Sequence, residues 1–345
     1  MYRFSKKTYS GGNMSQAGIV QKSNTKSVQK TNAFTNFIKE IKLNYTLFIL
    51  LLPGFILVFL LSYLPIPGLL IAFEKYKFVD KNFFVNLFKL EWLGFGNFWL
   101  FFNDPVFLNA IRNTVLYNLF FMVTGTVISL IIALVINEIT NRKLAKFYHS
   151  CMLLPYFLSW VVFSYVVFAF LGLENGFINN SIIVPLGLKE ISFYWEPKYW
   201  PFILFLVNTI KGAAYGSILY LSAIVSLEPE YFELARIYGA SKWQQITKIT
   251  LPLISNVVII LIILNLGNIL SADFGLFYNV PLRSGYLKNT TYIVDTYIFT
   301  LLEKGMSSSL GKTTAAGLFK SVIGMLTVLA ANFTVRKIDK EKALF

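Results

Sequence analysis

The segment EPEYFELARIYGASKWQQITKITLP, residues 228–252, decides the fold of this chain, because it is an ordered polar segment between two apolar stretches. Pro229 is typical of a first helical position, since proline lacks the N–H group that would be unpaired there. Gly239 is typical of a helix end, because glycine adopts left-handed backbone angles at no steric cost. Apolar residues then recur at helical spacing at Trp243, Ile246 and Ile249. The pattern predicts a helix, a tight turn and a second helix leading into the next apolar stretch.

The composition is that of a membrane protein. Of the 345 residues, 56% are hydrophobic and only 14% are charged, whereas soluble domains have roughly 45–50% apolar residues. The single cysteine, Cys151, excludes an internal disulfide, and the single histidine, His149, cannot form a histidine-rich metal site or a nucleophile–histidine–acid cluster. These counts argue against an enzyme, and we expect no catalytic residues and no metal site.

Six apolar stretches are each long enough to cross a membrane, which takes about 20 residues for a hydrocarbon core about 30 Å thick. They are residues 46–71, 113–137, 150–171, 201–225, 251–271 and 314–335. Pro53-Gly54 interrupts the first stretch and Pro155 the third, and we predict kinks there rather than helix ends, because neighbouring helices can satisfy the freed backbone groups. The fold class is therefore an all-α membrane protein with six transmembrane helices.

The distribution of basic residues predicts the orientation. Lys and Arg number 18 in the N-terminal tail, the C-terminus and the loops 138–149 and 228–250, against 11 in the alternate loops 74–112, 172–200 and 272–313. Basic loops stay in the cytoplasm, so both termini and the 228–250 loop are expected to face inward. The net charge of +14 thus reflects membrane orientation, and we expect no nucleic-acid partner.

The N-terminal region has two parts before the first apolar stretch. Residues 1–32 are polar and are expected to form a disordered cytoplasmic tail, because they cannot bury enough apolar surface to fold alone. Residues 33–45 place Phe34, Phe37 and Ile38 on one side, which predicts an amphipathic helix at the membrane surface. The chain ends in a short cytoplasmic C-terminus, residues 338–345.

The 228–250 loop resembles a known motif. Glu233-Leu-Ala235, Gly239 and Ile249-Thr-Leu-Pro252 have the spacing of the Glu-Ala-Ala, Gly, Ile-x-Leu-Pro signature in the membrane subunits of binding-protein-dependent (MetI-like) ABC importers, with Leu234 departing from the usual alanine. In that family the loop docks into a cleft on the ATPase subunit. The alternative is an ordinary amphipathic loop. The resemblance implies ATPase-coupling roles for Glu233, Ala235, Gly239, Ala240, Trp243, Ile249, Leu251 and Pro252.

The resemblance extends along residues 45–337 to the polysaccharide-type sugar permeases. Leu51-Leu-Pro-Gly54, Trp92-Leu-Gly94, Arg112-Asn-Thr114 and Gly317-Leu-Phe-Lys320 continue it. It implies a type I importer permease core at residues 113–337, preceded by a first span and external loop at residues 46–112.

The same resemblance implies the setting in which the chain works. The chain would lie in the bacterial cytoplasmic membrane, in contact with membrane lipid. The partners would be a second homologous permease, two ATPase subunits and an extracellular solute-binding protein that delivers oligosaccharides. ATP and magnesium would bind to the ATPase, so we expect no cofactor in this chain. Transport would proceed by alternating access.

The fourth apolar stretch carries Asn208, Lys211 and Tyr215 at intervals of three and four, which places them on one helical face. An ammonium group that faces lipid costs about 2.5–3.5 kcal/mol. Lys211 should therefore face a cavity or a paired group, and we interpret this face as one wall of a substrate pathway. The alternatives are a structural ion pair or a side chain that extends to the lipid headgroups.

The fifth and sixth stretches contribute Asn265, Asn268 and Lys320 to the same hypothesis. Asparagine amides can donate and accept hydrogen bonds, as sugar hydroxyl groups require, but they equally join helices. Lys320 lies in the Leu-Phe-Lys motif of the resembling family, so a role at the interface between permeases is an alternative to substrate contact. Gly212 and Gly216 form a Gly-x-x-x-Gly surface that is expected to pack against another helix.

The nature of the cargo stays open at this point. Lys211 and Lys320 are the only basic residues in the apolar stretches, and no acidic residue of the chain is expected at their depth. A positive pathway would favour an acidic oligosaccharide, uronate-containing or sulfated, because charge-assisted hydrogen bonds are about twice as strong as neutral ones. If acids of the second permease pair with the lysines, the cargo is a neutral oligosaccharide. Amino acids or peptides are a third class of cargo. The alternative to an ABC importer is an ion-coupled secondary transporter, but that class would need an acidic residue inside a span.

Overall fold

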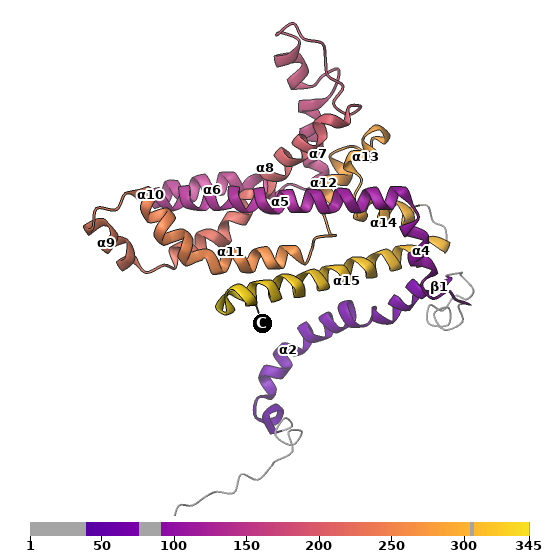
Figure 1. Cartoon of the computed structure of the whole chain (residues 1–345), viewed down its shortest axis with the longest axis horizontal. Coiled ribbons are helices and arrows are strands. Elements are labelled where there is room, and N and C mark those ends of the chain that lie inside the picture. Colours follow the sequence, from indigo (N-terminus) through magenta and orange to yellow (C-terminus); the bar gives the residue numbers. More distant parts are fainter. Residues whose placement is uncertain (1–38, 76–90, 304–306, 345) are drawn as a thin grey trace, which may run out of the picture. The chain divides into compact units, whose positions relative to one another are not determined.

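The computed structural model describes residues 39–75, 91–303 and 307–344, and the secondary structure there is helical apart from one short pair of strands (Figure 1). β1 (Glu74–Lys75) and β2 (Glu91–Trp92) pair in antiparallel fashion. The predicted tail and the first six residues of the predicted amphipathic helix lie outside the described residues. Residues 39–43 are helical, and Asn44 forms a bend before the next helix.

The chain divides into two units, which meet in sequence at Pro65. The first unit contains α2 (Tyr45–Val58) and a short π-helical segment, η1 (Phe59–Tyr63). Pro53 lies inside α2 and does not end it, in agreement with the sequence-based prediction.

The second unit contains the remaining helices. The longer ones are α4 (Gly96–Phe102), α5 (Pro105–Glu138), α6 (Arg142–Phe157), α7 (Trp160–Leu171), α8 (Trp200–Val225), α9 (Pro229–Ile237), α11 (Leu251–Leu266), α12 (Phe274–Asn279), α14 (Val294–Glu303) and α15 (Ser307–Ile338). The shorter ones are η2 (Ile66–Phe73), η3 (Asn179–Ile183), η4 (Pro197–Tyr199), α10 (Lys242–Gln245), η5 (Ile246–Thr250), η6 (Gly285–Leu287), α13 (Lys288–Thr291) and η7 (Lys340–Lys342).

Several of these helices are long and apolar enough to cross a membrane. Within the described residues they are Tyr45–Phe73, Pro105–Glu138, Pro197–Val225, Lys242–Leu266 and Leu310–Ile338. A sixth crossing exists if α6 and α7 count as one broken span, since these two helices meet at an angle of 98°. With that pair, the helices correspond to the six predicted apolar stretches.

The break between α6 and α7 corrects one prediction. The sequence predicted a kink at Pro155, but α6 ends at Phe157 and α7 begins at Trp160 in a new direction (Figure 1). Ser159 starts the new helix, since its Oγ accepts a hydrogen bond from the backbone N–H of Val162 at 3.2 Å. Pro155 removes a backbone donor near the end of α6, and the capped restart allows the change of direction.

The two long helices α5 and α8 pack closely against each other. Ser129 on α5 donates a hydrogen bond from Oγ to the carbonyl oxygen of Ala213 at 2.9 Å. A Cβ atom at Gly216 would lie 2.6 Å from Ser129 Oγ, so glycine allows this approach without a shift of the serine. The predicted glycine packing surface is thus present at Gly216, whereas a Cβ at Gly212 would meet nothing within 4 Å.

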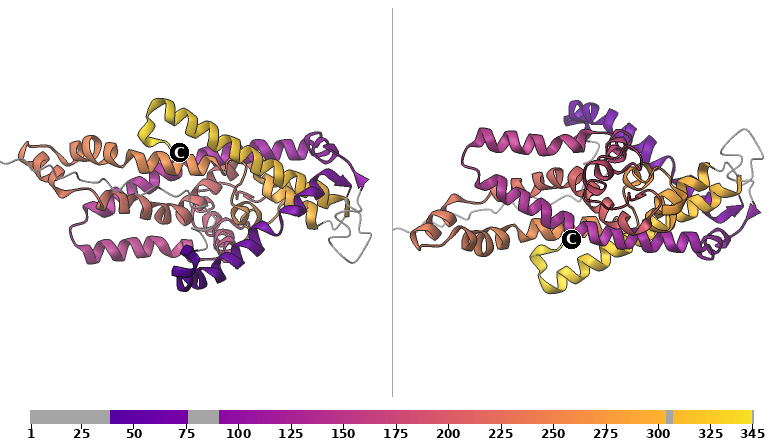
Figure 2. Two further views of the ribbon diagram at one scale, coloured as in Figure 1. Left: turned by 90° about the horizontal axis from the view of Figure 1, so that it is seen from below. Right: turned by 90° about the horizontal axis from the view of Figure 1, so that it is seen from above.

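Residues 272–303, predicted as part of an external loop, fold into α12, α13 and α14. α14 contacts both α5 and α15, and in both views of Figure 2 this orange segment lies beside the yellow helix α15. Asn113 on α5 donates from Nδ2 to the carbonyl oxygen of Tyr292 at 3.0 Å, and the backbone N–H of Val294 donates to Thr114 Oγ1 at 3.0 Å. These bonds hold the segment against the side of the spans.

Two apolar clusters support this arrangement. One joins α5, α7, α8 and α12, and its buried members include Tyr117, Phe163, Trp200, Leu204 and Phe277. The other joins η2, α4, α5, α14 and α15, and its buried members include Ala72, Phe101, Phe107, Val294 and Ala315.

Candidate transport pathway and coupling loop

A cavity of about 390 Å³ lies between α5, α8 and α11, and we call it the pathway cavity. Its wall is completed by residues 267–273, the irregular segment between α11 and α12, which we call the cavity segment. Amide and hydroxyl groups dominate its polar lining. The polar residues are Asn118, Thr126, Ser129, Asn208, Tyr220, Asn265, Asn268, Ser271 and Asp273.

Three of the six predicted pathway residues line this cavity. Asn208 lies on α8 and Asn265 in the last turn of α11, while Asn268 follows in the cavity segment. The predicted fifth span, residues 251–271, included both Asn265 and Asn268, but α11 ends at Leu266, so Asn268 reaches the cavity from a turn. Their contact with a substrate stays a prediction.

Asn118 was missed by the sequence reasoning, although an amide in an apolar stretch is a usable signal. Its Nδ2 donates hydrogen bonds to the carbonyl oxygens of Asn268, Ile269 and Ser271, at 3.2, 2.8 and 3.2 Å. These carbonyl groups follow the end of α11, where, within the described residues, only that of Asn268 among the three accepts from a backbone N–H, that of Ser271, and a side chain from α5 supplies a donor to all three. Asn118 therefore fixes the backbone of the cavity segment from one side.

Lys211 does not line the pathway cavity. It is 6% exposed, and its ammonium donates to the carbonyl oxygens of Pro155 and Tyr156, at 3.1 and 3.0 Å, and to that of Leu158. These carbonyl groups lie at the end of α6, where the helical hydrogen bonds stop, and in the described part of the chain only that of Pro155 among them also accepts from a backbone N–H, that of Leu158. The ammonium also lies 4.9 Å from the centre of the Trp160 ring. Lys211 thus supplies hydrogen-bond donors to the backbone at the break between α6 and α7.

Tyr215 lies beside this break as well. Its ring stacks on that of Tyr156, with centroids 4.1 Å apart and an interplanar angle of 1°. Trp160 connects the break to the cavity, because its Nε1 donates to Asp273 Oδ2 at 3.0 Å. The other carboxylate oxygen of Asp273 accepts from the backbone N–H of Gly275 at 2.9 Å. The predicted face of α8 is therefore divided between the pathway cavity and the end of α6.

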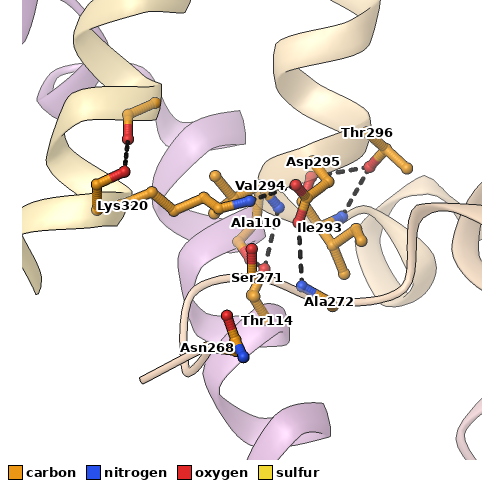
Figure 3. Close-up of polar contacts among 12 residues, drawn as sticks. Ala110, Thr114, Asn268, Ser271, Ala272, Ile293, Val294, Asp295, Thr296 and Lys320 are labelled. Atoms are coloured by element: carbon orange, nitrogen blue, oxygen red, sulfur yellow. Dashed lines mark hydrogen bonds and ion pairs between the residues drawn. The ribbon is translucent and has the colours of Figure 1, made fainter. Parts of the chain in front are cut away.

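Lys320 has an acidic partner within this chain, which corrects a second prediction. Its Nζ contacts Asp295 Oδ1 on α14, and both side chains are largely buried (Figure 3). The sequence placed no acid at the depth of Lys320, because residues 272–313 were expected to be an external loop. The packing of α14 on α15 brings the carboxylate to the span, so Lys320 does not leave a net positive charge there.

The coupling loop, residues 228–250, has the predicted geometry. α9 begins at Pro229, and Gly239 after it has a φ of 75°. Ser241 then caps α10, since its Oγ accepts from the N–H of Gln244 while the Gln244 side chain accepts from the N–H of Ser241. From Lys242 the helix runs without interruption through η5 into α11. The second part of the loop is thus a continuous extension of a transmembrane helix.

The predicted coupling residues all lie in this hairpin or at the start of the helix that follows it. Lys242 bonds to Glu138 at the end of α5, with 2.5 Å between Nζ and Oε2. Three large apolar side chains of the loop face outward, Ile237, Tyr238 and Trp243, with exposed fractions of 79%, 87% and 72%. Within the described ranges, no group of three or more His, Cys, Asp or Glu side chains could hold a metal ion.

Residues 125–340 match the family described as binding-protein-dependent transport system inner membrane component. The chain belongs to this family. It is therefore a membrane-embedded transport subunit and not an enzyme, in agreement with the resemblance of the coupling loop.

Two relatives from Bacillus subtilis (strain 168) align along most of their length. Protein LplB is 30% identical over 307 residues, which cover 89% of this chain and 93% of the relative. The polygalacturonan/rhamnogalacturonan transport system permease protein YteP is 31% identical over 305 residues, which cover 88% and 91%.

Solved structures agree on the fold. A chain in the crystal structure of a bacterial ABC transporter involved in the import of the acidic polysaccharide alginate matches with a TM-score of 0.77 and 32% identity, over 88% of this chain and 99% of that chain. A bacterial alginate transporter in complex with an alginate pentasaccharide-bound periplasmic protein matches with a TM-score of 0.76 and 32% identity, over 88% and 98%. The predicted MetI-like permease fold is confirmed.

Proposed function

We propose that this chain is a transmembrane permease subunit of an ATP-driven importer of oligosaccharides. The observation that carries the proposal is the polar lining of the pathway cavity, where four asparagine side chains gather with hydroxyl groups. Each amide donates and accepts hydrogen bonds, and sugar hydroxyl groups do the same, so the lining suits a polyhydroxylated cargo. The names of the relative YteP and of the alginate transporter support the sugar class.

The proposed complex contains a second homologous permease, two ATPase subunits that bind ATP and magnesium, and an extracellular solute-binding protein. The periplasmic protein in the alginate complex supports the last of these partners. We place the chain in the bacterial cytoplasmic membrane with both termini inside. The termini and the loops on their side carry the excess of basic residues, and basic loops stay in the cytoplasm. The coupling loop then faces the ATPase, and its exposed Tyr238 and Trp243 supply apolar surface for docking.

Within the oligosaccharides we favour an acidic, uronate-containing cargo. The support is the acidic character of alginate and polygalacturonan, which are named for the matching transporters. The two lysines inside the spans give no such support, because Lys320 is paired with Asp295 and Lys211 donates to backbone carbonyl groups. Carboxylate recognition in this chain would rest on the amide N–H groups of Asn208, Asn265 and Asn268 or on the unseen partners. Neutral oligosaccharides are the competing class.

Uptake by the assembled transporter in proteoliposomes, with its binding protein, tests the proposal. Oligogalacturonides and neutral galacto-oligosaccharides of equal length should be compared, and we expect uptake of the acidic sugar. Asn265→Leu should reduce uptake about 2- to 12-fold, the equivalent of one hydrogen bond worth roughly 0.5–1.5 kcal/mol. Asn256→Leu on the same helix is the control, because Asn256 does not line the cavity. Equal effects of the two substitutions would show that the cavity is not part of the transport pathway. Uptake of amino acids or peptides alone would refute the sugar assignment.

A further inference from the structure

We propose that Asp295 and Lys320 position the cavity segment for transport, and that they do so through one backbone N–H group. Asp295 Oδ2 accepts a hydrogen bond from the backbone N–H of Ala272 at 3.0 Å, while its Oδ1 contacts Lys320 Nζ (Figure 3). The pair is a positioning device for residues that line the pathway cavity. This inference rests on the proposed transport function, but the geometry on which it depends can be tested without any cargo.

Besides its own backbone turn hydrogen bonds, the cavity segment is held at several points by side chains of other helices. Asn118 on α5 donates hydrogen bonds to carbonyl oxygens in the middle of the segment. Asp295 on α14 accepts a hydrogen bond from the N–H of Ala272 near the end of the segment. Ser271, whose carbonyl oxygen is one of these anchor points, directly precedes Ala272, and Asp273 directly follows it, and both Ser271 and Asp273 line the pathway cavity. Asp295 therefore determines the position of cavity residues without lining the cavity itself.

The last span, α15, contacts the same segment at its beginning. A Cβ atom at Gly324 would lie 2.3 Å from the carbonyl oxygen of Gly267, so the helix backbone approaches the segment there. Lys320 lies one turn earlier on α15 and reaches the end of the segment through Asp295. A displacement of α15 must therefore move both ends of the cavity segment, which couples this helix to the lining of the pathway.

A purely structural role does not account for the pair. α14 and α15 are already joined by an apolar cluster that includes Val294, Tyr297 and Ala316. Buried ion pairs seldom stabilise a fold more than apolar residues of similar size, because the two charges must be taken out of water. The pair instead fixes the direction of one carboxylate, since Lys320 occupies Oδ1 and leaves Oδ2 for Ala272. Without Lys320, Asp295 would be a buried charge free to turn or to bind a proton.

Thiol labelling of the assembled transporter tests the position of the segment directly. In a Cys151→Ser background, Ser271→Cys reports on the cavity segment, and Thr126→Cys reports on the opposite wall of the same cavity, on α5. We expect Lys320→Met to change the labelling rate of Ser271→Cys by roughly 2- to 30-fold, the range for substitutions that alter coupling between sites. The labelling rate of Thr126→Cys should not change. An equal change at both positions, or none at Ser271→Cys, would overturn the proposal.

Two double variants distinguish positioning from a simple salt bridge. Asp295→Asn with Lys320→Met keeps an acceptor oxygen for Ala272 without a buried charge, so labelling and uptake should return toward the parent values. Asp295→Lys with Lys320→Asp restores opposite charges but removes the acceptor, so neither should recover. If labelling and uptake recovered in the charge-exchanged variant but not in Asp295→Asn with Lys320→Met, the positioning role would be refuted. Because the labelling needs no cargo, a failure of the sugar assignment would leave this result standing.

Discussion

At the scale of single residues, the enclosure of Lys211 determines what its replacement should do. In Lys211→Met the carbonyl groups of Tyr156 and Leu158 lose the ammonium donor, whereas that of Pro155 keeps the backbone N–H of Leu158, and a buried group left unpaired costs about 1–3 kcal/mol. We expect a lower thermal midpoint of the solubilised complex and an unchanged preference between acidic and neutral oligosaccharides. The exposed Lys198 provides the control, since Lys198→Met should change neither quantity. An altered preference in Lys211→Met would mean that its ammonium reaches the cargo.

Glu74 supports a prediction about pH. This residue, beyond the end of the first span, is 7% exposed, and its Oε2 lacks a hydrogen-bond partner in the part of the chain that the structure describes. Burial raises the pKa of the Glu74 carboxyl above its usual value. The folded state therefore binds the proton more tightly than the unfolded state, and stability falls as pH rises through the raised pKa.

Glu74→Gln should accordingly stabilise the protein at pH 7. The gain should shrink as the pH is lowered toward the ordinary pKa of a glutamate, where the parent carboxyl is protonated in both states. Thermal unfolding of the two proteins at a series of pH values measures the effect. The exposed Glu91 on the paired strand is the matched control, and Glu91→Gln should give no such pH-dependent gain. A destabilised Glu74→Gln at pH 7 would show that the carboxylate is stabilised by its surroundings.

The residue scale also shows where sequence reasoning was limited. Asn265 and Asn268, which line the cavity, could be singled out from the sequence because amides in apolar stretches stand out, and their contact with a substrate stays a prediction. The pairing of Lys320 with Asp295 could not be predicted, since the two residues are 25 positions apart and only the packing of α14 brings them together. Similarly, the carbonyl groups that hold Lys211 become available only because α6 ends before Ser159.

At the scale of elements, the turn of the coupling loop depends on the backbone of Gly239. Its φ of 75° is accessible to glycine, less costly for asparagine than for other residues, and strongly unfavourable for a β-branched residue. Gly239→Val should therefore reduce uptake and sugar-stimulated ATP hydrolysis to background while the protein still inserts, and Gly239→Asn should retain a measurable part of both. If valine and asparagine behaved alike at position 239, the turn geometry would not matter for coupling.

Glu233 on α9 belongs to the same element, and the family resemblance places it against a basic residue of the ATPase. Glu233→Lys should weaken co-purification with the ATPase and abolish transport, because like charges would then face each other. Glu230→Lys on the same helix is the control and should be milder. Normal co-purification and transport with Glu233→Lys would contradict the docking role of the loop.

Helix types and order were largely predictable at this scale, because apolar length and end signals such as Pro229 and Gly239 are local properties. The break between α6 and α7 was not. A proline within an apolar stretch is compatible with a kink or with an end, and the choice depends on Lys211, which lies on another helix and satisfies the freed carbonyl groups.

At the scale of the whole molecule, the orientation in the membrane can be measured with single cysteines. In a Cys151→Ser background, Ser181→Cys should react with a membrane-impermeant thiol reagent in intact cells, because residues 172–200 are predicted to lie outside. Thr140→Cys, in the loop between α5 and α6, should react only after the membrane is opened. The reverse pattern would invert the orientation, and reaction of both residues in intact cells would contradict the number of crossings between them.

The exposed apolar surface of the coupling loop has a consequence for the synthesis of the protein in the cell. In the proposed orientation, a newly made subunit without the proposed ATPase partner would present Ile237, Tyr238 and Trp243 to the cytoplasm, and apolar surface of this kind is recognised by chaperones and proteases. We therefore expect the amount of this subunit to follow the amount of ATPase made with it. An excess of unassembled copies would be degraded, so the stoichiometry of the transporter would be enforced by the same surface that we propose docks on the ATPase.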